Sequence, residues 1–243
     1  MNKILCEQLA IDYCCTPEDI LDDKNHFTKH EFLPGRRKFR EDEECFLKIA
    51  AINGKVLFCG NAEIIKWCSE NFKGDGSEWF FEGENLSLLV NRLGESEYMI
   101  KSIHPFFISE TISDVDTKDF EIDWYRDEEI ERFRGDERFD EAYSFSEDAP
   151  DVLGVSASKD GKILGMAGAS RDSETMWQIG INVDPDCREA GIGKMLVALL
   201  KNEILKKGLL PFYGTSVSHL ASQRVAIGAG FLPAWFEMAT EKI

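Results

Sequence analysis

The sequence lacks any long uninterrupted hydrophobic run. Nowhere in its 243 residues does an apolar stretch approach the ~20 residues that a helix needs to cross a bilayer. The first residues, Met-Asn-Lys-Ile-Leu-Cys-Glu-Gln, carry a charge and an amide too early for a secretory signal peptide. We therefore expect a cytoplasmic protein that has no membrane partner.

Basic residues are scarce. The chain has 28 Lys and Arg against 45 Asp and Glu, which gives a formal net charge of −17. No basic patch with interleaved aromatic residues occurs, so we expect no nucleic-acid partner and no anionic membrane surface. With 43% hydrophobic and 30% charged residues, the composition is that of a globular chain, long enough for one large or two small cores.

Metal-binding and redox motifs are also missing. The seven cysteines form no C-x-x-C pair, and their odd number favours free thiols in a reducing compartment. No H-E-x-x-H occurs. His26 and His30 lie four residues apart, a spacing that could place both on one helical face, but no third ligand stands nearby. We expect no metal ligands.

One short segment carries most of the functional information. An apolar run from Trp177 to Val183 predicts a strand, and an Arg188-x-x-Gly191-x-Gly193 turn and an amphipathic helix follow. The two glycines let backbone N–H groups approach a ligand without interference from a Cβ atom. Because the helix N-terminus adds positive charge, the segment predicts a binding site for a pyrophosphate.

Two common nucleotide-binding motifs do not fit this turn. A P-loop needs G-x-x-x-x-G-K-[ST], but Arg188 stands at the first Gly position and Met195 follows Lys194. A dinucleotide fingerprint needs G-x-G-x-x-G, but Leu196 occupies the third Gly position. A turn without a ligand is the other interpretation of a motif with only two glycines.

The turn resembles the acyl-coenzyme A signature R/Q-x-x-G-x-G/A of the GNAT acetyltransferase superfamily. The order of elements downstream strengthens this resemblance, which covers the C-terminal half and is strongest from Trp177 onward. The positions that match the usual Asn-x-x-[SA]-x-x-[LV]-Tyr followed by Gly-Phe are His219, Ser222, Val225, Ala226, Gly230 and Phe231. The resemblance implies an α/β (α+β) fold, with a mixed, mostly antiparallel central sheet flanked by helices.

The second half, residues 116–243, shows the complete series of elements that such a domain requires. Asp160-Gly161 is a strong hairpin turn. The periodicity predicts strands at Asp119–Trp124, Val152–Ser158, Lys162–Ala169, Met176–Val183 and Leu209–Val217, a closing strand through Trp235 and Met238, and helices at Asp127–Tyr143, Ile192–Lys207 and Leu220–Ala229.

The first half, residues 1–115, predicts an α+β domain of unknown role. Asn53-Gly54 is a strong hairpin signal between Phe46–Ile52 and Val56–Cys59. The half contains no second Arg-x-x-Gly-x-Gly turn, so a degenerate GNAT-like half and an unrelated α+β cap are both open. The other elements expected are helices at Leu5–Asp12, Pro17–Leu21, Ala62–Phe72 and Asn85–Leu93, and an apolar strand through Ile103 and Ile108.

The resemblance implies acetyl-coenzyme A as co-substrate, held mainly by the main chain. The strand that ends at Val183 would splay from its neighbour and offer backbone groups to the pantetheine arm, and the turn would hold the pyrophosphate. The residues expected to bind the coenzyme are Ile181, Asn182, Val183, Arg188, Glu189, Ala190, Gly191, Ile192, Gly193 and Lys194, together with His219 and Ser222.

Acetyl transfer needs a neutral amine, a stabilised oxyanion and a proton for the departing thiolate. The family's frequent tyrosine acid falls on Ala226 here, and its frequent strand carboxylate falls on Gln178. Other side chains must therefore supply these groups if the protein is an enzyme. The catalytic candidates are Tyr213, His219, Ser222 and Glu174, with Glu237 as a further base acting through a water molecule.

These residues favour an acetyl-coenzyme A-dependent N-acetyltransferase acting on a small, cationic amine. The segment 116–151 carries fifteen acids against five bases and would concentrate such an acceptor. A non-catalytic acyl-coenzyme A sensor and an enzyme that acetylates protein lysines or N-termini are the alternatives. Oligomeric state stays open, with a homodimer formed through an exposed edge strand near the C-terminus as one possibility.

Overall fold

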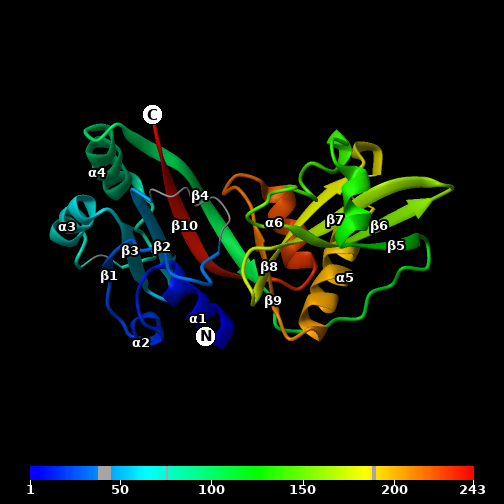
Figure 1. Ribbon diagram of the computed structural model, residues 1–243, viewed down its shortest axis with the longest axis horizontal. Helices are drawn as coiled ribbons and strands as arrows, with labels where there is room; N and C mark the ends of the chain where they lie inside the picture. Colours follow the sequence, from blue (N-terminus) through cyan, green and yellow to red (C-terminus); the bar gives the residue numbers. More distant parts are fainter. Residues whose placement is uncertain (38–44, 75, 188–189) are drawn as a thin grey trace. The chain divides into compact units, whose positions relative to one another are not determined.

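The computed structural model describes residues 1–37, 45–74, 76–187 and 190–243, and the chain divides into two compact units (Figure 1). The first unit contains residues 1–106, 216–218 and 234–243, and the second contains residues 107–215 and 219–233. The domain boundary that we place after residue 115 stays a prediction.

The first unit is an α+β structure, as expected. Its strands follow the order β1-β3-β2-β10-β4. Its helices α1 and α2 precede the sheet in sequence, and α3 and α4 follow the β2–β3 hairpin. The elements are α1 (Lys3–Asp12), α2 (Pro17–Leu21), β1 (His26–Lys29), β2 (Leu47–Ile52), β3 (Lys55–Gly60), α3 (Ala62–Asn71), α4 (Gly83–Gly94), β4 (Tyr98–Ile108) and β10 (Leu232–Lys242).

The hairpin of the first unit forms where the sequence predicts it. Asn53 and Gly54 both have positive φ angles, 54° and 84°, as a two-residue turn of this kind requires. Every residue of β2 and β3 is buried, and the strands pack with α3 and α4 around Phe58. Burial on both faces explains why these strands are nearly continuous apolar runs.

Strand β10 corrects one expectation. We expect an exposed edge strand near the C-terminus, but β10 lies between β2 and β4, and its residues 236–239 pair with 48–51 of β2. Strand β10 is therefore interior, and the expectation that the strand near the C-terminus is an exposed edge is wrong. The oligomeric state itself stays open.

The second unit is built on a sheet with strand order β9-β8-β7-β6-β5. Strands β5 to β8 are antiparallel neighbours, and β8 and β9 are parallel, so the sheet is mixed and mostly antiparallel, as expected. Its elements are β5 (Glu121–Arg126), the 3₁₀ helices η1 (Asp127–Phe133) and η2 (Glu137–Phe139), β6 (Asp151–Lys159), β7 (Lys162–Arg171), β8 (Met176–Val183), η3 (Pro185–Cys187), α5 (Ile192–Lys206), β9 (Leu210–Gly214) and α6 (Leu220–Gly228).

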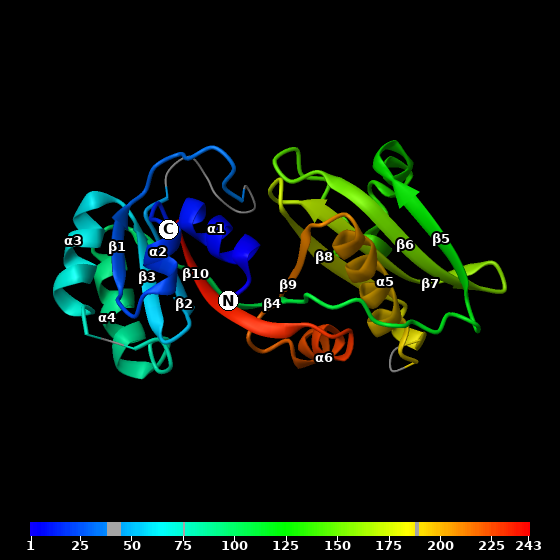
Figure 2. The same ribbon diagram turned by 90° about the horizontal axis from the view of Figure 1, so that it is seen from below.

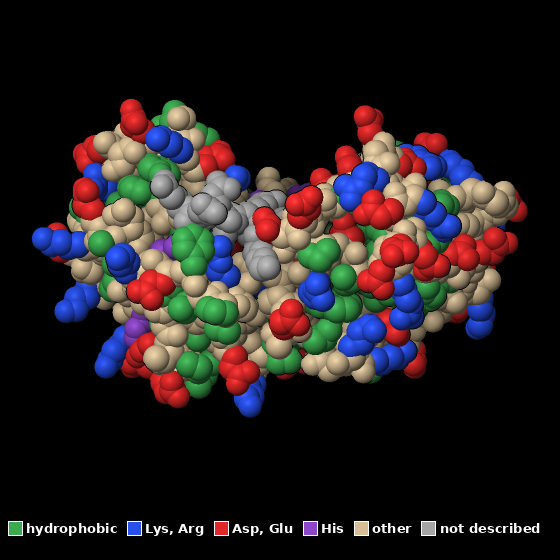
Figure 3. Space-filling view, viewed as in Figure 1, with side chains coloured by type: hydrophobic (Ala, Val, Ile, Leu, Met, Phe, Trp, Pro, Cys, Tyr) green, Lys and Arg blue, Asp and Glu red, His purple; other side chains and the backbone are tan. Residues whose placement is uncertain are grey.

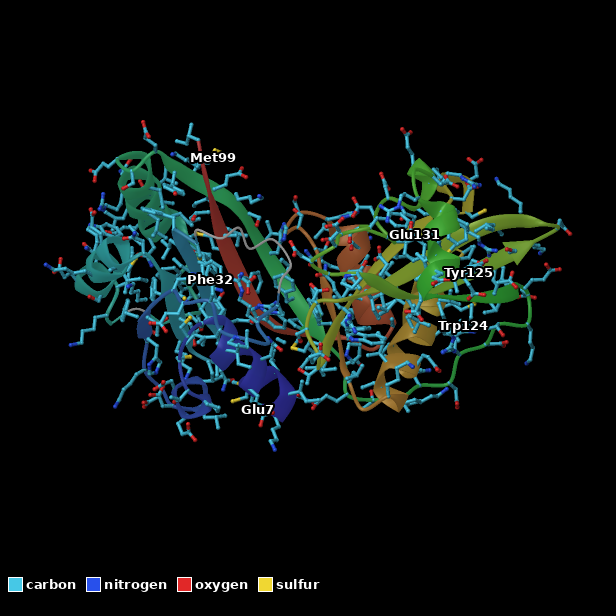
Figure 4. All side chains as sticks on the ribbon, viewed as in Figure 1. Glu7, Phe32, Met99, Trp124, Tyr125 and Glu131 are labelled. Carbon is cyan, nitrogen blue, oxygen red and sulfur yellow. The ribbon has the colours of Figure 1, made fainter. Side chains whose placement is uncertain are left out.

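The two faces of this sheet bury different partners. Helix α5 runs along strands β6 to β8 (Figures 1 and 2), and its apolar side packs into a core with Val155 and Ile179. The opposite face carries an aromatic cluster that includes Tyr125, Phe133 and Tyr143. Figure 4 labels neighbours on β5 that serve these two layers, since Trp124 packs on the α5 side and Tyr125 on the aromatic side.

The helix expected over Asp127–Tyr143 is wrong. Two short 3₁₀ helices stand there, separated at Gly135, whose φ of +81° belongs to the left-handed region that ends a helix. The rest of the segment lies almost in contact with the sheet, since a Cβ added at Gly168 would sit 2.0 Å from the carbonyl oxygen of Ala142. An α-helix, about 10 Å across with its side chains, does not fit in such a space.

In the described part of the chain, no helix combines the length and the apolar character that crossing a membrane requires.

Candidate functional site

Strands β8 and β9 separate part of the way along their length. Their parallel pairing joins Met176 to Leu210, Trp177 to Pro211 and Gln178 to Phe212, and no register partner on β9 follows among the described residues. Strand β8 stays paired with β7 through Val183. The stretch 179–183 of β8 therefore has one edge open toward β9, which is the splay that the sequence analysis expects.

The open edge leads into the turn before α5. Gly191 is the N-cap of α5, with a φ of +80°, and among the described residues no heavy atom beyond its chain neighbours lies within 4 Å of a Cβ built on it. A leucine or other bulky residue there would be strained and would occupy this open space. No described side chain caps the helix, and its first turn contains no acid. The first N–H groups of α5 are therefore available to an anion.

The residues around Gly191 have distinct positions. Ala190 and Lys194 are exposed, whereas Ile192 and Gly193 are buried. A Cβ added at Gly193 would lie 3.3 Å from Val183 Cγ2 and 3.5 Å from Val225 Cγ2, so this glycine faces packed side chains. Gly193 thus lets α5 begin close to β8 and α6, while Gly191 faces open space. The predicted coenzyme contacts Arg188 and Glu189 lie outside the described residues.

One acid at the end of β8, close to this turn, is already paired. Asp184 follows β8 directly, and its carboxylate lies 2.6 Å from Lys162 Nζ. This hydrogen bond with Lys162 lowers the pKa of Asp184. The lysine offsets a negative charge that would otherwise oppose a phosphate at the start of α5.

The first unit has a strand–helix turn without these properties. Strand β3 leads into α3 through Asn61, whose side chain accepts a hydrogen bond from the N–H of Glu63. Glu63 also places a negative charge in the first turn of α3. A capped helix start with an acid in its first turn does not favour an anion. Of these two strand–helix turns, the one before α5 is suited to a phosphate.

Two catalytic candidates come together beside the open edge. Tyr213 of β9 directly follows the last residue paired with β8, and its hydroxyl lies 2.8 Å from Ser222 Oγ of α6. Burial raises the pKa of Tyr213, although the hydrogen bond with Ser222 lowers it in part. Ala226, one turn after Ser222, is buried in the same core as Tyr213. The tyrosine hydroxyl therefore reaches α6 from β9, near the alanine that stands at the family's tyrosine position.

The other catalytic candidates lie apart from this pair. His219 is the exposed N-cap of α6 and makes no capping hydrogen bond through its side chain. Glu174 is exposed in the turn between β7 and β8, at the end of β8 that is remote from the α5 turn. Eight residues of strand span about 26 Å. Glu237 lies in the first unit, where it bonds to Arg37 and Tyr13.

On the aromatic side of β8, two polar side chains differ in their bonding. Asn182 Oδ1 accepts hydrogen bonds from the N–H groups of Glu141 and Ala142, and its Nδ2 donates to Asp140. Its side chain thus holds the neighbouring segment, which leaves only its backbone for a coenzyme. Gln178 Oε1 is buried and has no hydrogen-bond partner among the described residues. A donor on a bound molecule would satisfy it.

A group of potential metal ligands occurs in the first unit. Side-chain atoms of Asp19, Asp22 and His26 lie within 4.8 Å of one another. The buried ammonium of Lys55 donates to Asp22, however, and Thr16 donates to Asp19 through both its N–H and its hydroxyl. The cluster already holds a cation, which disfavours a second one. His26 begins strand β1 and His30 follows it, so the two histidines do not share a helical face.

Sequence reasoning missed the segment that Asn182 holds. The signal that could have revealed it is a glycine in each of three consecutive strands, Gly154, Gly168 and Gly180, which are direct cross-strand neighbours. Such a row leaves space for a backbone to cross the sheet.

The sequence of the second half matches a known family. The model of the acetyltransferase (GNAT) family matches residues 111–231. Among curated proteins, none matches the chain in sequence.

Several solved structures are similar to this fold. A GCN5-related N-acetyltransferase-like protein from Streptococcus suis is 14% identical, with a TM-score of 0.48, over 87% of this chain and 90% of that one. An acetyltransferase of the GNAT family from Colwellia psychrerythraea is 15% identical, with a TM-score of 0.43, over 59% and 57%. An aminoglycoside N-acetyltransferase in complex with CoA is 25% identical, with a TM-score of 0.35, over 47% and 92%. At these scores, the neighbours identify neither the substrate nor the site residues of this chain.

Proposed function

Because residues 111–231 of this chain are an acetyltransferase domain of the GNAT family, we propose that the protein transfers the acetyl group of acetyl-coenzyme A to a small amine. The observation that supports this most directly is the open edge of β8, residues 179–183, which leads to the uncapped start of α5. A long molecule with a pyrophosphate at one end matches this combination. Backbone groups along the edge would bind its arm, and the helix start would bind its phosphates.

The residues present fit coenzyme A. The backbone of Ile181, Asn182 and Val183 would hold the pantetheine arm, and the N–H groups from Gly191 to Lys194 would hold the pyrophosphate. Lys194 is exposed and adds positive charge at this turn, while Lys162 offsets the charge of Asp184. When bound, acetyl-coenzyme A supplies an activated acetyl thioester. We place its reactive end toward Gln178, where β8 and β9 join, because the phosphates occupy the opposite end of the edge.

Tyr213 is our candidate for the acid that protonates the departing sulfur. Its hydroxyl stands at the start of the separation of β9 from β8 and is oriented by Ser222. Its raised pKa keeps it protonated at neutral pH, as a proton donor must be. Ser222 is a positioning residue in this proposal, and His219, exposed at the start of α6, is a candidate contact of the coenzyme.

We propose a small cationic amine as the acceptor. The net charge of −17 and the fifteen acids of segment 116–151 favour attraction of a cation. Several bases of this segment are engaged by neighbouring acids, as in the pairs Arg134–Glu131 and Arg138–Asp136. Figure 3 shows acidic and basic side chains interleaved over the visible face of the second unit. The unsatisfied Gln178 Oε1 is suited to accept a hydrogen bond from the acceptor's N–H.

The test is calorimetric titration of acetyl-coenzyme A and coenzyme A into the wild type and two glycine variants. Gly191→Leu should weaken binding at least tenfold, because its side chain fills the space that the phosphates need. Gly161→Leu is the matched control: Gly161 also has a left-handed φ, +75°, and open space at its Cβ, but it lies in the β6–β7 turn. Backbone strain is similar in both, so only the phosphate site distinguishes them. Wild-type binding by a folded Gly191→Leu variant would contradict the proposal.

A further inference from the structure

Three glycines form a row across the second sheet. Gly154 of β6 pairs with Gly168 of β7, which pairs with Gly180 of β8. An added Cβ would lie 1.8 Å from the Tyr143 hydroxyl at Gly154, 2.0 Å from the carbonyl oxygen of Ala142 at Gly168, and 2.0 Å from that of Glu141 at Gly180. The segment 141–143 therefore crosses the sheet in direct contact with it. No side chain other than hydrogen fits beneath this segment.

The end of the segment at β8 is fixed by hydrogen bonds. Asn182 Oδ1 lies 3.0 Å from the backbone nitrogen of Glu141 and 2.6 Å from that of Ala142. Its Nδ2 donates to Asp140 Oδ1 at 3.0 Å. Tyr143 anchors the other end in the aromatic cluster, stacked with Phe133. Glu141 is thus held at a defined position on an otherwise irregular stretch of chain.

That position is beside the proposed site, against Gly180, which is two residues from Gln178 and the proposed reactive end. Gly180 and Asn182 both belong to the stretch of β8 whose edge is open toward β9. Glu141 is exposed, and its charge is close enough to raise the pKa of Tyr213 further, beyond the larger effect of burial. Strand β8 itself offers Gln178 on this face, and an amide cannot take a proton from an ammonium. The crossing segment brings a carboxylate to the same face of the same strand.

We propose that Glu141 contacts the acceptor amine and takes its proton, as the general base of the reaction. This inference rests on the proposed function. The carboxylate accepts one proton from the acceptor ammonium, and as an exposed group it returns this proton to water. The neutral nitrogen then forms the new C–N bond while the thioester C–S bond breaks. Tyr213 gives a proton to the sulfur, and the second proton lost by the nitrogen, carried through water, restores the tyrosine hydroxyl.

The experiment compares Glu141→Gln with the wild type in a thiol-release assay. The substrates are acetyl-coenzyme A and a panel of a polyamine, an aminoglycoside and single amino acids, over pH 6.5 to 9.5. General bases contribute typically about 10²- to 10⁴-fold, so kcat should fall at least a hundredfold at pH 7. The loss should shrink at higher pH, because more of the amine is already neutral. Glu137→Gln, at an exposed position of the nearby η2, should keep the wild-type profile.

Binding measurements separate the possible failures. Calorimetry should give the same affinity for coenzyme A in the wild type, Glu141→Gln and Glu137→Gln. A Glu141→Gln variant with the wild-type pH profile overturns the role of Glu141. So does a wild type that binds coenzyme A but releases no thiol with any amine, which leaves the coenzyme site intact. A folded wild type that does not bind coenzyme A overturns the proposed function itself.

A second variant tests the position of the carboxylate without removing it. Gly180→Ala places a methyl group against the carbonyl of Glu141, so the segment must move away from β8. We expect the same loss at pH 7 and the same recovery at high pH as for Glu141→Gln. A Gly180→Ala variant that folds and retains wild-type kcat across the pH range would show that the position of Glu141 does not matter for the reaction.

Discussion

Replacing Arg37 by methionine should destabilise the first unit strongly. The Arg37 side chain is 9% exposed and joins two carboxylates, with Nε 2.5 Å from Asp12 Oδ2 and Nη2 2.8 Å from Glu237 Oε2. The Asp12 side chain is only 2% exposed. Methionine would fill much of the same volume, but it would leave two carboxylates without their cation. Removal of one partner from a buried ion pair costs about 3–5 kcal/mol.

The pH dependence of this penalty has a definite sign. Burial raises the pKa of Glu237, but the Arg37 guanidinium outweighs burial and holds it below its usual value. The wild-type cluster therefore contributes stability above the unfolded pKa, about 4.3, and loses it as the pH falls through the lower folded pKa. Without Arg37, burial is opposed only by the charge of Lys48 and the hydrogen bond from Trp235, so the folded pKa of Glu237 rises. The variant then gains stability relative to the wild type on acidification.

Urea unfolding followed by circular dichroism at pH 7.5 and pH 3.5 measures both effects, because the lower pH lies below the unfolded pKa of the carboxylate. Arg36→Met is the matched control, since Arg36 is half-buried and lies 4.3 Å above the Phe32 ring, a contact worth about 0.5–1 kcal/mol. A penalty for Arg37→Met below about 1 kcal/mol at pH 7.5 would refute the reasoning. A penalty equal at both pH values would also refute it, because the carboxylates would then not be its source.

Two other predictions concern a hydroxyl and a thiol. Tyr213→Phe should leave the affinity for coenzyme A, measured by calorimetry, unchanged and should lower kcat at least tenfold in the thiol-release assay. Loss of its hydrogen bond with Ser222 should cost about 1 kcal/mol of stability. An unchanged kcat would remove Tyr213 from the catalytic candidates. The rate at which Cys14 reacts with iodoacetamide should rise with pH and reach half its maximum near pH 6, because a hydrogen bond from Cys59 lowers the pKa of Cys14 to about 6. Peptide mass spectrometry should show Cys15 unmodified at pH 7, since burial raises its pKa to about 12. A rate midpoint above pH 8 for Cys14 would contradict the expected shift of its pKa.

Local signals were sufficient for most elements of the fold. The helix expected at Ile192–Lys207 is α5, Ile192–Lys206, and the strand expected at Met176–Val183 is β8 with the same bounds. The signals for these boundaries, a glycine turn and a regular spacing of apolar residues, lie within a few residues of them in the sequence. The turns at Asn53-Gly54 and Asp160-Gly161 formed for the same reason.

The segment 127–143 could not be predicted in this way. Its apolar residues recur at spacings compatible with a helix, and its acids suit a solvated helix face. What decides its path is the row of glycines on β6, β7 and β8, which come later in the sequence and act only once the sheet has formed. A window along the chain does not contain that information.

The candidate site also has parts that local sequence could indicate and parts that depend on contacts between distant residues. The phosphate turn depends on neighbouring residues, so the sequence alone could indicate it. The Tyr213–Ser222 pair depends on how β9 meets α6, and the sequence could only nominate its two members separately. The position of Glu141 depends on Asn182 and Gly180, some forty residues further along the chain. Nothing near Glu141 in the sequence sets it apart from the other acids of its segment.

The membership of β10 in the first unit has a consequence for the order of folding during synthesis. The strand between β2 and β4 is supplied by residues 234–243, which follow the whole second unit in sequence, whereas the second unit needs only residues 107–233, apart from the short stretch 216–218. On a ribosome that releases the chain from its N-terminus, the second unit is therefore complete while the first still has a gap in the middle of its sheet. The half of the chain that is made first is the half that finishes last, and until then β2 and β4 expose edges that other chains could occupy.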